Sequence, residues 1–339
     1  MIGDTIDPGA LGSKFLRAAP AAGLDPAADL KFAYNSPAIS YSPSMRGLAG
    51  RLFYRLADRR SWEWWGFQQT LMKVIEDNQP KLVIVTGILP LQVRIFKMLR
   101  HNGVKIVNYL TDDPWNPIHR RRCFLKNIAH YDHIFSTKAK LCPRLKAAGV
   151  KSCSWLPFAF DPYLHKPPTY PQKLDVDVVF VGTGALERLP WLNALAELPG
   201  LKLCIYGNNW NGIDTPGWLV REAVIGDEYA QIIHGSRIVL GLVRRTNGDL
   251  STDRSYEIGA IGGCGVYQDT SEHRALIPDY PEDGFFSNPQ QLKERVQLIL
   301  SDNYLQQELR LIAAKALQNT KHTYSERLRS IISWAETQS

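Results

Sequence analysis

The densest run of side chains that could bind a phosphorylated ligand begins at Asp249. Ser251, Arg254 and Glu257 follow within a few residues, and the pattern predicts a short helix with Arg254 and Glu257 in its first turn and Gly262 near its end. The start of a helix offers free backbone N–H groups and the positive end of the helix dipole, which suit a diphosphate. Arg254 adds a forked cation, and Glu257 can accept both hydroxyls of a ribose. The alternative is an ordinary ion pair within the helix.

A glycine-containing loop follows the apolar run that ends at residue 181. Gly182, Thr183 and Gly184 form this loop, and Arg188 lies in the helix predicted after it. Such a loop lets the backbone approach a phosphate, or it is a tight turn with no ligand. A dinucleotide site is disfavoured, because the strand expected at 201–206 carries no acidic residue at its end for a ribose.

Two further loops follow predicted strands of the same half. Tyr206, Gly207 and Asn208 end one strand and could contact a base or a ribose. Arg244 ends another and could face phosphates. Either loop could equally be a solvated connection with no ligand.

The first half of the chain offers a different set of candidates. Asp112 and Asp113 directly follow an apolar run, where a carboxylate could bind acceptor hydroxyls or act as a base. The alternative is helix capping ahead of the next proline. His119 and Lys138 are weaker candidates, whereas His133 lies in an apolar run and is expected to be a satisfied core histidine.

The elements that position these residues follow an alternating order. From residue 81 on, short apolar runs alternate with helical patterns, which predicts an α/β fold of two Rossmann-like domains, each a parallel sheet with helices on both faces. Ligands are expected beyond the carboxyl ends of the strands, in a cleft between the domains. The predicted parts are an acceptor domain at 1–160, a proline-containing linker at 161–175, a nucleotide-sugar-binding domain at 176–322 and a helix at 323–339 that can pack back on the first domain.

The start of the chain fits this order less well. A glycine loop and helix at 9–22 should follow a first strand, but only Met1 and Ile2 remain to form it. The first strand is therefore expected to be degenerate, unless the start codon lies further upstream.

Composition excludes several classes of protein. The five cysteines have no Cys-x-x-Cys spacing, so neither a disulfide framework nor a zinc site is predicted. No apolar run approaches the length of a transmembrane helix, and the N-terminus does not resemble a signal peptide, so a cytoplasmic protein is expected. The net charge of +7 favours an anionic partner without choosing among nucleotides, acidic glycans, phospholipid surfaces and nucleic acid.

Part of that charge is concentrated in residues 46–65. The segment predicts a basic amphipathic helix that lies on a membrane surface or meets an acidic acceptor. The alternative is a surface helix whose apolar stripe packs in the core. The residues concerned are Arg46, Arg51, Arg55, Arg59 and Arg60, beside Leu48, Leu52, Phe53, Leu56, Trp62, Trp64 and Trp65.

Several of these segments together carry a resemblance to a known family. The Arg-x-x-Glu helix start at 254–257 is the most specific of them, and Asp112-Asp113-Pro114 is another. Supporting segments are 131–137, 156–162, 283–285 and 322–327. The chain resembles bacterial group 1 glycosyltransferases of the CgeB-like (spore maturation protein) type over residues from about 80 to 330.

This resemblance implies a GT-B fold, a nucleotide-diphospho-sugar donor on the C-terminal domain, an acceptor on the N-terminal domain, retention of anomeric configuration, and no metal or other cofactor. The implied roles are charge offset by Arg254 with Arg188 or Arg244, ribose binding by Glu257, sugar contact by Asp249 or Ser251, and acceptor orientation by Asp112 or Asp113. Asp249 stands where the family has a glutamate. The acceptor is a glycan, a lipid-linked sugar, a protein or a small molecule.

Three alternatives to a transferase stay open at this stage. A nucleotide-sugar epimerase of the same fold would use the same nucleotide site and need no acceptor. A non-catalytic nucleotide- or sugar-binding protein would bind donor without turnover. A nucleic-acid-binding protein is suggested by the charge alone, and the sequence holds no specific recognition motif for it.

Overall fold

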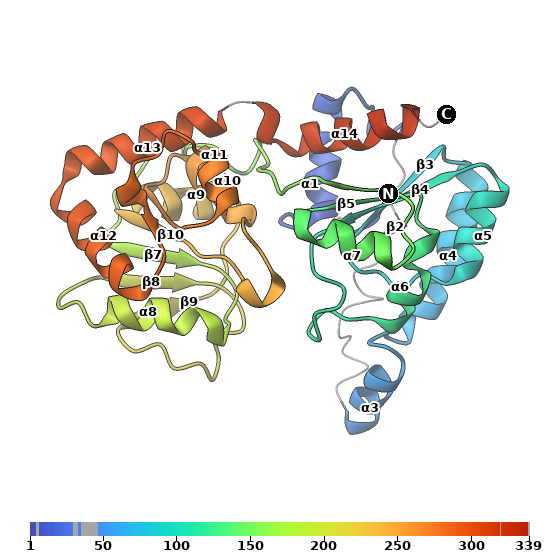
Figure 1. Cartoon of the computed structure of the whole chain (residues 1–339), viewed down its shortest axis with the longest axis horizontal. Helices are drawn as coiled ribbons and strands as arrows, with labels where there is room; N and C mark the ends of the chain where they lie inside the picture. Colours follow the sequence, from blue (N-terminus) through green and yellow to red (C-terminus); the bar gives the residue numbers. More distant parts are fainter. Residues whose placement is uncertain (5–6, 30–32, 35–46, 319, 338–339) are drawn as a thin grey trace. The chain divides into compact units, whose positions relative to one another are not determined.

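The chain forms two compact units (Figure 1). The structure is a computed structural model that describes residues 1–4, 7–29, 33–34, 47–318 and 320–337. The first unit combines Met1–Pro157 with Ser325–Ser339, and the second is Phe158–Tyr324, which includes the proline-containing segment 161–175. Each unit is a parallel β-sheet with helices packed on it, so the predicted α/β class with two Rossmann-like domains is confirmed.

The first unit has a six-stranded sheet in the order β2-β1-β3-β4-β5-β6, with every strand pair parallel. Its strands are β1 (Ile2–Gly3), β2 (Ala33–Tyr34), β3 (Leu82–Thr86), β4 (Lys105–Leu110), β5 (His133–Ser136) and β6 (Cys153–Trp155). Its helices are α1 (Leu11–Ala18), α3 (Leu48–Leu56), α4 (Glu63–Asn78), α5 (Val93–His101), α6 (Arg122–Asn127), α7 (Cys142–Ala147) and α14 (Tyr324–Thr337). Short 3₁₀ turns are η1 (Pro20–Ala22), η3 (Ile128–His130) and η4 (Ala139–Leu141).

The predicted first strand is as short as the sequence indicates. Strand β1 has two residues, and it lies between β2 and β3 in the sheet. Ile2 is buried, and its carbonyl accepts a hydrogen bond from Thr86 Oγ1 at 3.1 Å. Pairing on both sides compensates for the small number of backbone hydrogen bonds that two residues can form.

The second unit has a six-stranded sheet in the order β12-β11-β10-β7-β8-β9, again with every pair parallel. Its strands are β7 (Val178–Val181), β8 (Leu203–Tyr206), β9 (Trp218–Arg221), β10 (Ile238–Gly241), β11 (Gly265–Gln268) and β12 (Phe285–Phe286). Its helices are α8 (Leu189–Ala196), α9 (Gly226–Gly235), α10 (Asp253–Ile261), α11 (Ser271–Leu276), α12 (Pro289–Ser301) and α13 (Asn303–Leu317). Its 3₁₀ turns are η5 (Leu186–Arg188), η6 (Arg245–Asn247), η7 (Glu282–Gly284) and η8 (Thr320–His322).

The order of these strands determines where a ligand can bind. From β7 the chain moves through α8 to β8 in one direction across the sheet, whereas from β10 it moves through α10 to β11 in the other. Since such crossovers are right-handed, α8 and α10 cover opposite faces. The strand order therefore reverses between β7 and β10. In open α/β sheets, ligands bind at such a point, beyond the carboxyl ends of the two strands.

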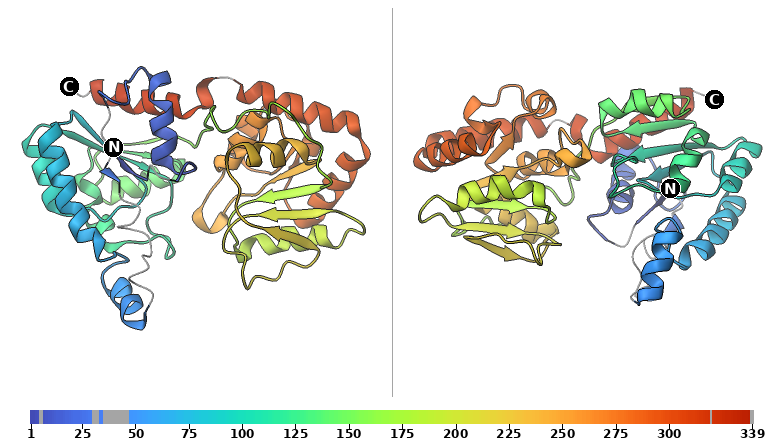
Figure 2. Two further views of the ribbon diagram at one scale, coloured as in Figure 1. Left: turned by 180° about the vertical axis from the view of Figure 1, so that it is seen from behind. Right: turned by 60° about the horizontal axis from the view of Figure 1, so that its bottom comes forward.

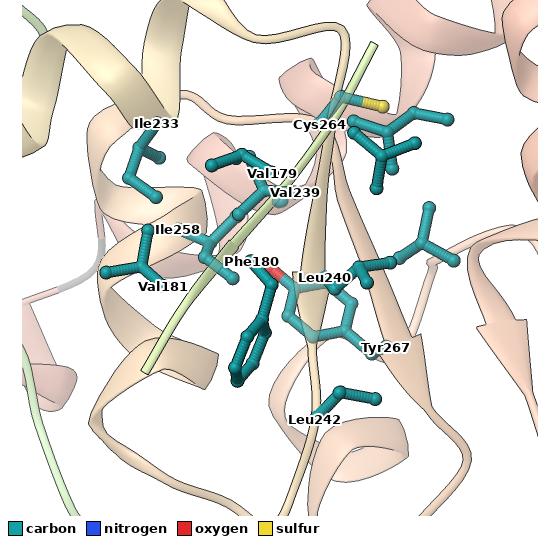
Figure 3. Close-up of a cluster of buried hydrophobic side chains, with 14 of the residues drawn as sticks. Val179, Phe180, Val181, Ile233, Val239, Leu240, Leu242, Ile258, Cys264 and Tyr267 are labelled. Carbon is teal, nitrogen blue, oxygen red and sulfur yellow. The ribbon is translucent and has the colours of Figure 1, made fainter. Parts of the chain in front are cut away.

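The core of the second unit lies between this sheet and its helices. Figure 3 shows side chains of β7, β10 and β11 meeting Ile233 from α9 and Ile258 from α10. The continuous apolar strands expected of a parallel sheet are present, because every residue of β7, β10 and β11 is buried. Helix α10 is thus fixed on the sheet by its own apolar residues, and it begins after the loop that follows the carboxyl end of β10.

Candidate functional site

The candidate site lies at the reversal point of the second unit. It combines the loop after β7, the loop after β10 and the N-terminal end of α10. Glu187 connects the first two of these, because its carboxylate accepts hydrogen bonds from Thr246 N at 2.9 Å and Thr246 Oγ1 at 2.7 Å. The residues predicted from separate segments of sequence therefore meet at one edge of the sheet.

The glycines of the first loop allow two backbone segments to pack closely. A Cβ atom on Gly184 would lie 2.2 Å from the carbonyl oxygen of Asn209, and one on Gly207 would lie 2.0 Å from that of Gly182. The N–H of Gly182 donates to Tyr206 O at 2.9 Å, and that of Gly184 donates to Asn208 O at 2.7 Å. Within the described part of the chain, the N–H of exposed Thr183 has no acceptor, so it is the group of this loop left for a ligand.

Replacing Gly184 with alanine should destabilise the second unit by about 1–3 kcal/mol, because the new methyl group meets the backbone of Asn209 and cannot be relieved by a side-chain rotation. Differential scanning calorimetry measures this as a lower melting temperature. Gly66→Ala is the control, since Gly66 lies in α4 with no atom near the added methyl group. Equal melting temperatures for the two variants would contradict the close packing of the loops.

Arg188 is a buried cation at this edge. Its side chain is only 6% exposed and lies over the Phe180 ring at 4.8 Å, and Nη1 donates to Thr183 O. Burial, together with the neighbouring cations Arg244 and Arg254, lowers the pKa of Arg188 to about 10. Its Nε has no hydrogen-bond acceptor among the described residues. Three guanidinium groups therefore gather here, and one of them carries an unmatched donor.

Arg254 lies in the first turn of α10, as predicted, and Glu257 lies at the start of the second turn rather than in the first. Nη1 of Arg254 donates to Glu257 Oε2, Nε donates to Val181 O at 3.2 Å, and the guanidinium lies over the Tyr229 ring at 5.1 Å. Burial opposes the charge on Arg254, but the Glu257 carboxylate raises its pKa above the ordinary value. Glu257 is 1% exposed whereas the Arg254 side chain is 34% exposed, so the cation faces outward from a buried anchor.

Two residues of this anchor were not predicted from the sequence. Tyr229 Oη donates to Glu257 Oε2 at 3.0 Å, and buried His165 lies with Nε2 3.4 Å from Glu257 Oε1. The backbone N–H of Asp161 donates to Nδ1 of His165 at 3.1 Å, so a neutral His165 carries its proton on Nε2 and donates it to Glu257. A histidine in a proline-containing segment far from residue 257 gives no sequence signal for this role.

The loop after β10 contributes a second buried carboxylate. Arg244 Nε lies 3.3 Å from Asp249 Oδ2, and Asn247 Nδ2 donates to Asp249 Oδ1 at 3.1 Å. Ser251 is also buried, and its hydroxyl donates to Glu272 Oε2 at 2.5 Å. Asp249 and Ser251 thus support the loop that carries Arg244.

A buried histidine fixes the start of α10. Thr252 and Ser255 form a capping box, in which Ser255 Oγ accepts from Thr252 N at 2.9 Å. Ser255 Oγ lies 2.6 Å from His273 Nε2, and His273 Nδ1 lies 2.6 Å from Gln268 O. The carbonyl requires the proton on Nδ1, so Nε2 accepts from Ser255, and burial lowers the pKa of His273 to about 4.

Acid should therefore destabilise the second unit well above the range in which carboxylates titrate. Between about pH 6.5 and pH 4 the unfolded chain binds a proton on residue 273 that the folded chain does not, so the free energy of unfolding falls as pH falls, by up to about 3 kcal/mol. Neutral His273 makes its full contribution to the free energy of unfolding above pH 6.5. Calorimetry at pH 7, 6, 5 and 4.5 measures the decline.

The control for this pH dependence is His273→Gln, which should be less stable at pH 7 but lose less stability between pH 6.5 and 4. Arg274 lowers the pKa of Asp269 through a hydrogen bond, so that carboxylate acts only below about pH 4 and does not overlap. A variant with the same pH dependence as the unmodified chain would contradict the assignment to His273.

The other residues predicted to bind the nucleotide-sugar donor lie in two places. Tyr206 ends β8, and Gly207 and Asn208 follow it; Tyr206 O and Asn208 O accept hydrogen bonds from the loop at 182–184. Gly262 lies instead at the C-terminal end of α10, where its φ of 84° ends the helix and its carbonyl accepts from Arg310 Nη1 at 2.7 Å. This left-handed conformation explains why residue 262 is a glycine. Gly262 is not among the residues gathered at the reversal point.

The first unit holds the predicted acceptor-side residues after β4. Asp112 Oδ1 lies 3.5 Å from His119 Nε2, and each of these side chains is about one quarter exposed, at 24% and 25%. Asp113 accepts from the N–H of Trp115 at 2.9 Å in a local turn, and no helix begins at Pro114, so the alternative prediction of helix capping is wrong. Lys138 is buried, and its Nζ donates to Thr111 O. The Asp112–His119 pair is therefore a partly exposed polar pair of this loop.

His133 is a satisfied core histidine, as predicted. Its Nδ1 and Nε2 lie 2.8 Å from Ser152 Oγ and Ser154 Oγ, and burial lowers its pKa to about 4. It takes no part in a site.

The described residues form neither a cluster of metal-ligand type nor a helix that could span a membrane. No group of three or more His, Cys, Asp or Glu side chains is arranged to hold a metal ion in the described ranges. No helix in the same ranges combines the length and the apolar character required to cross a bilayer.

The chain is similar to known proteins in sequence over one region. Residues 188–333 match a family model described as "Glycosyl transferase-like". No curated protein sequence matches the chain.

Solved structures are similar over most of the chain. Sucrose-phosphate synthase from Thermosynechococcus elongatus has a TM-score of 0.57 at 13% identity, over 80% of this chain and 78% of that one. A DNA-modifying β-glucosyltransferase, crystallised in the presence and absence of its substrate UDP-glucose, has a TM-score of 0.59 at 15% identity, over 96% and 93%. Staphylococcus aureus MnaA, solved with UDP, has a TM-score of 0.50 at 14% identity, over 80% of each chain. These similarities show that the fold is of the GT-B type.

Proposed function

We propose that this protein is a glycosyltransferase that takes a sugar from a nucleotide-diphospho-sugar and that the second unit binds the donor. The observation that carries the proposal is the gathering of Arg188, Arg244 and Arg254 at the reversal point. Arg188 is a buried cation beside two others, and its unmatched Nε–H is a donor that a bound diphosphate could satisfy. The glycosyl transferase-like match covers the same region, and UDP or UDP-glucose is named in two of the structures with this fold.

In this proposal the arginines act on the leaving group. When the bond between the sugar and the diphosphate breaks, negative charge grows on the diphosphate, and fixed guanidinium groups stabilise it. The N–H of Thr183 adds a backbone donor beside them. We include metal independence and retention of anomeric configuration in the proposal, as the CgeB-like resemblance implies.

Glu257 has two candidate roles, which are to hold Arg254 and to bind the ribose. The role that its present contacts support is to hold Arg254, because both carboxylate oxygens already face Arg254, Tyr229 or His165. Binding the ribose hydroxyls, the role implied by the resemblance, requires one of these partners to move. Asp249 and Ser251 are proposed to contact the sugar after a similar rearrangement.

The first unit is proposed to bind the acceptor. The Asp112–His119 pair offers a carboxylate and an imidazole that could orient an acceptor hydroxyl. The acceptor class is a glycan, a lipid-linked sugar, a protein or a small molecule.

A thermal-shift series with UDP, GDP, dTDP, ADP and CMP tests the donor site. One nucleotide family should raise the melting temperature, since a ligand at about 100 times its dissociation constant adds about 2.7 kcal/mol to the free energy of unfolding. The sugar conjugate of that nucleotide is then incubated with candidate acceptors while nucleotide release and sugar products are measured. Absence of stabilisation by every nucleotide would contradict the donor site.

Three results of the turnover assay separate the candidate functions. Nucleotide release that depends on an acceptor supports the transferase. A changed sugar without an acceptor would indicate an epimerase, and stable binding without any change in the sugar would indicate a binding protein.

A further inference from the structure

Helix α3 exposes an apolar stripe that no described part of the chain covers. Leu48, Leu52 and Leu56 are 81%, 58% and 78% exposed, and α3 has no buried residue at all. Residues four apart lie on the same face of a helix, so the three leucines form one row along about 12 Å of helix. The alternative prediction, in which the apolar stripe of residues 46–65 packs in the core, is therefore wrong for these leucines and holds for Trp64, which is fully buried.

The charges of α3 flank this row on one side. Arg51 and Arg55 lie one residue before Leu52 and Leu56, which places them at the edge of the leucine row. Both are exposed, and neither side chain has an ion-pair or hydrogen-bond partner in the described ranges. The nine residues of α3 include no carboxylate. Of the predicted basic cluster, Arg46 lies outside the described residues.

The end of α3 is attached firmly to the body of the first unit. Asp58 and Arg59 adopt left-handed conformations, with φ of 58° and 57°, and turn the chain sharply after the helix. The Asp58 carboxylate accepts from Arg122 N at 2.7 Å and Cys123 N at 2.8 Å, at the start of α6. Arg59 Nη2 donates to Pro117 O at 2.8 Å. These bonds present α3 as a fixed projection, which Figures 1 and 2 show standing away from the sheet of this unit.

Two exposed tryptophans follow α3 in the chain, and one of them stacks on it. Trp62 is 52% exposed and stacks on Phe53 of α3, with ring centroids 3.5 Å apart. Trp65 is 41% exposed and lies under Arg60, whose guanidinium is 4.7 Å from the ring centroid. Tryptophan beside arginine is typical of the boundary between acyl chains and headgroups.

We propose that α3, with Trp62 and Trp65, docks the protein on the surface of an anionic phospholipid bilayer. The leucine row would enter the headgroup–acyl boundary, while Arg51 and Arg55 at its edge would contact lipid phosphates. The charges argue against pairing with a second copy of the chain, because two such faces would bring the same arginines together with no carboxylate of α3 to neutralise them. This inference goes beyond the proposed glycosyl transfer and does not depend on it.

Flotation of the full chain with phospholipid vesicles tests the docking surface. Vesicles of phosphatidylcholine with 30% phosphatidylglycerol should bind the protein, and pure phosphatidylcholine should bind it about 30-fold less tightly, because two cations near an anionic surface contribute roughly that factor. Raising the salt concentration to about 0.5 M should weaken binding to the anionic vesicles.

Two sets of substitutions separate the contributions of the surface. Leu48→Ser, Leu52→Ser and Leu56→Ser together should weaken binding to anionic vesicles by about 100-fold, since they remove the inserted apolar area. Arg51→Glu together with Arg55→Glu should weaken binding to anionic vesicles by a similar factor, although the leucine row is intact. The matched control changes three exposed leucines of the second unit, Leu219, Leu298 and Leu311, to serine and should bind as the unmodified chain does.

Failure of the unmodified chain to bind anionic vesicles would overturn the proposal, as would full binding by the leucine variant. A dimer in solution that the leucine variant converts to a monomer, without vesicle binding by either, would also overturn it and assign the stripe to self-association. Circular dichroism confirms that each variant is folded, which is expected because none of the substituted side chains is buried.

Discussion

Replacing Arg254 with methionine should weaken the binding of UDP, or of whichever nucleoside diphosphate the protein selects, by about 100-fold. Hydrogen bonds to charged groups contribute about 1.5–3 kcal/mol each, and methionine removes the charge while retaining much of the volume. Turnover of the nucleotide-sugar should fall by about 100- to 1000-fold, because the guanidinium stabilises charge that grows only as the sugar leaves. Isothermal titration calorimetry with UDP and a nucleotide-release assay measure the two effects.

Arg295→Met is the matched control for this variant. Arg295 is also a partly exposed arginine of the second unit, and it pairs with Asp283 before the amino end of β12, away from the carboxyl ends of the strands. The UDP affinity of Arg254→Lys should lie between those of Arg254→Met and Arg295→Met. Lysine keeps a positive charge to pair with Glu257 but loses the forked geometry of the guanidinium. Equal UDP affinities for Arg254→Met and Arg295→Met would remove the arginine cluster as the diphosphate site.

Replacing Glu257 with alanine should lower the free energy of unfolding of the second unit by about 3 kcal/mol. The carboxylate is buried, and its loss leaves Arg254, Tyr229 and His165 without their shared acceptor. Glu257→Gln keeps the volume and one acceptor oxygen, so it should cost about 1 kcal/mol. Both variants should bind UDP less tightly because Arg254 is no longer held in place. Chemical denaturation and titration calorimetry measure these changes.

A ligand without ribose hydroxyls separates the two roles of Glu257. If the carboxylate only anchors Arg254, UDP and 2′,3′-dideoxy-UDP should lose affinity equally in Glu257→Gln. A preference for UDP that disappears in Glu257→Gln would show that the ribose reaches the carboxylate. Unchanged stability of Glu257→Ala would contradict the anchoring role itself.

The parts of the fold with regular patterns could be predicted from the sequence. Strands such as β4, β7 and β10 are buried along nearly their whole length and are read directly as apolar runs. Strand β9 was not predicted, because it is an edge strand with three of its four residues exposed and so carries no continuous apolar run. Strand β12 was missed because two residues are too few to form a pattern.

The charged residues of the candidate site could be predicted from the sequence, but the residues that hold them in place could not. The spacing of Arg254 and Glu257 places them on one helix face, and the structure pairs them. The contribution of His165 depends on the chain returning to α10 after about 90 residues, which no local pattern encodes. A glycine signals either close approach of a ligand or a left-handed turn, and the sequence alone does not distinguish these, so the prediction that Gly262 binds the donor could not be separated from its role in ending the helix.

The first unit is assembled from two stretches separated by the whole of Phe158–Tyr324. Its second stretch supplies buried Leu328 and Ile331, a hydrogen bond of 2.8 Å from Arg327 Nε to Pro157 O, and the Trp334 ring that lies 4.8 Å from the His133 ring. During synthesis on the ribosome, the continuous unit emerges complete while the earlier one still waits for its last helix. A truncation that removes residues 325–339 should therefore destabilise the unit at the opposite end of the sequence, and a fragment of residues 1–157 expressed alone should depend on a chaperone or on the missing helix added in trans.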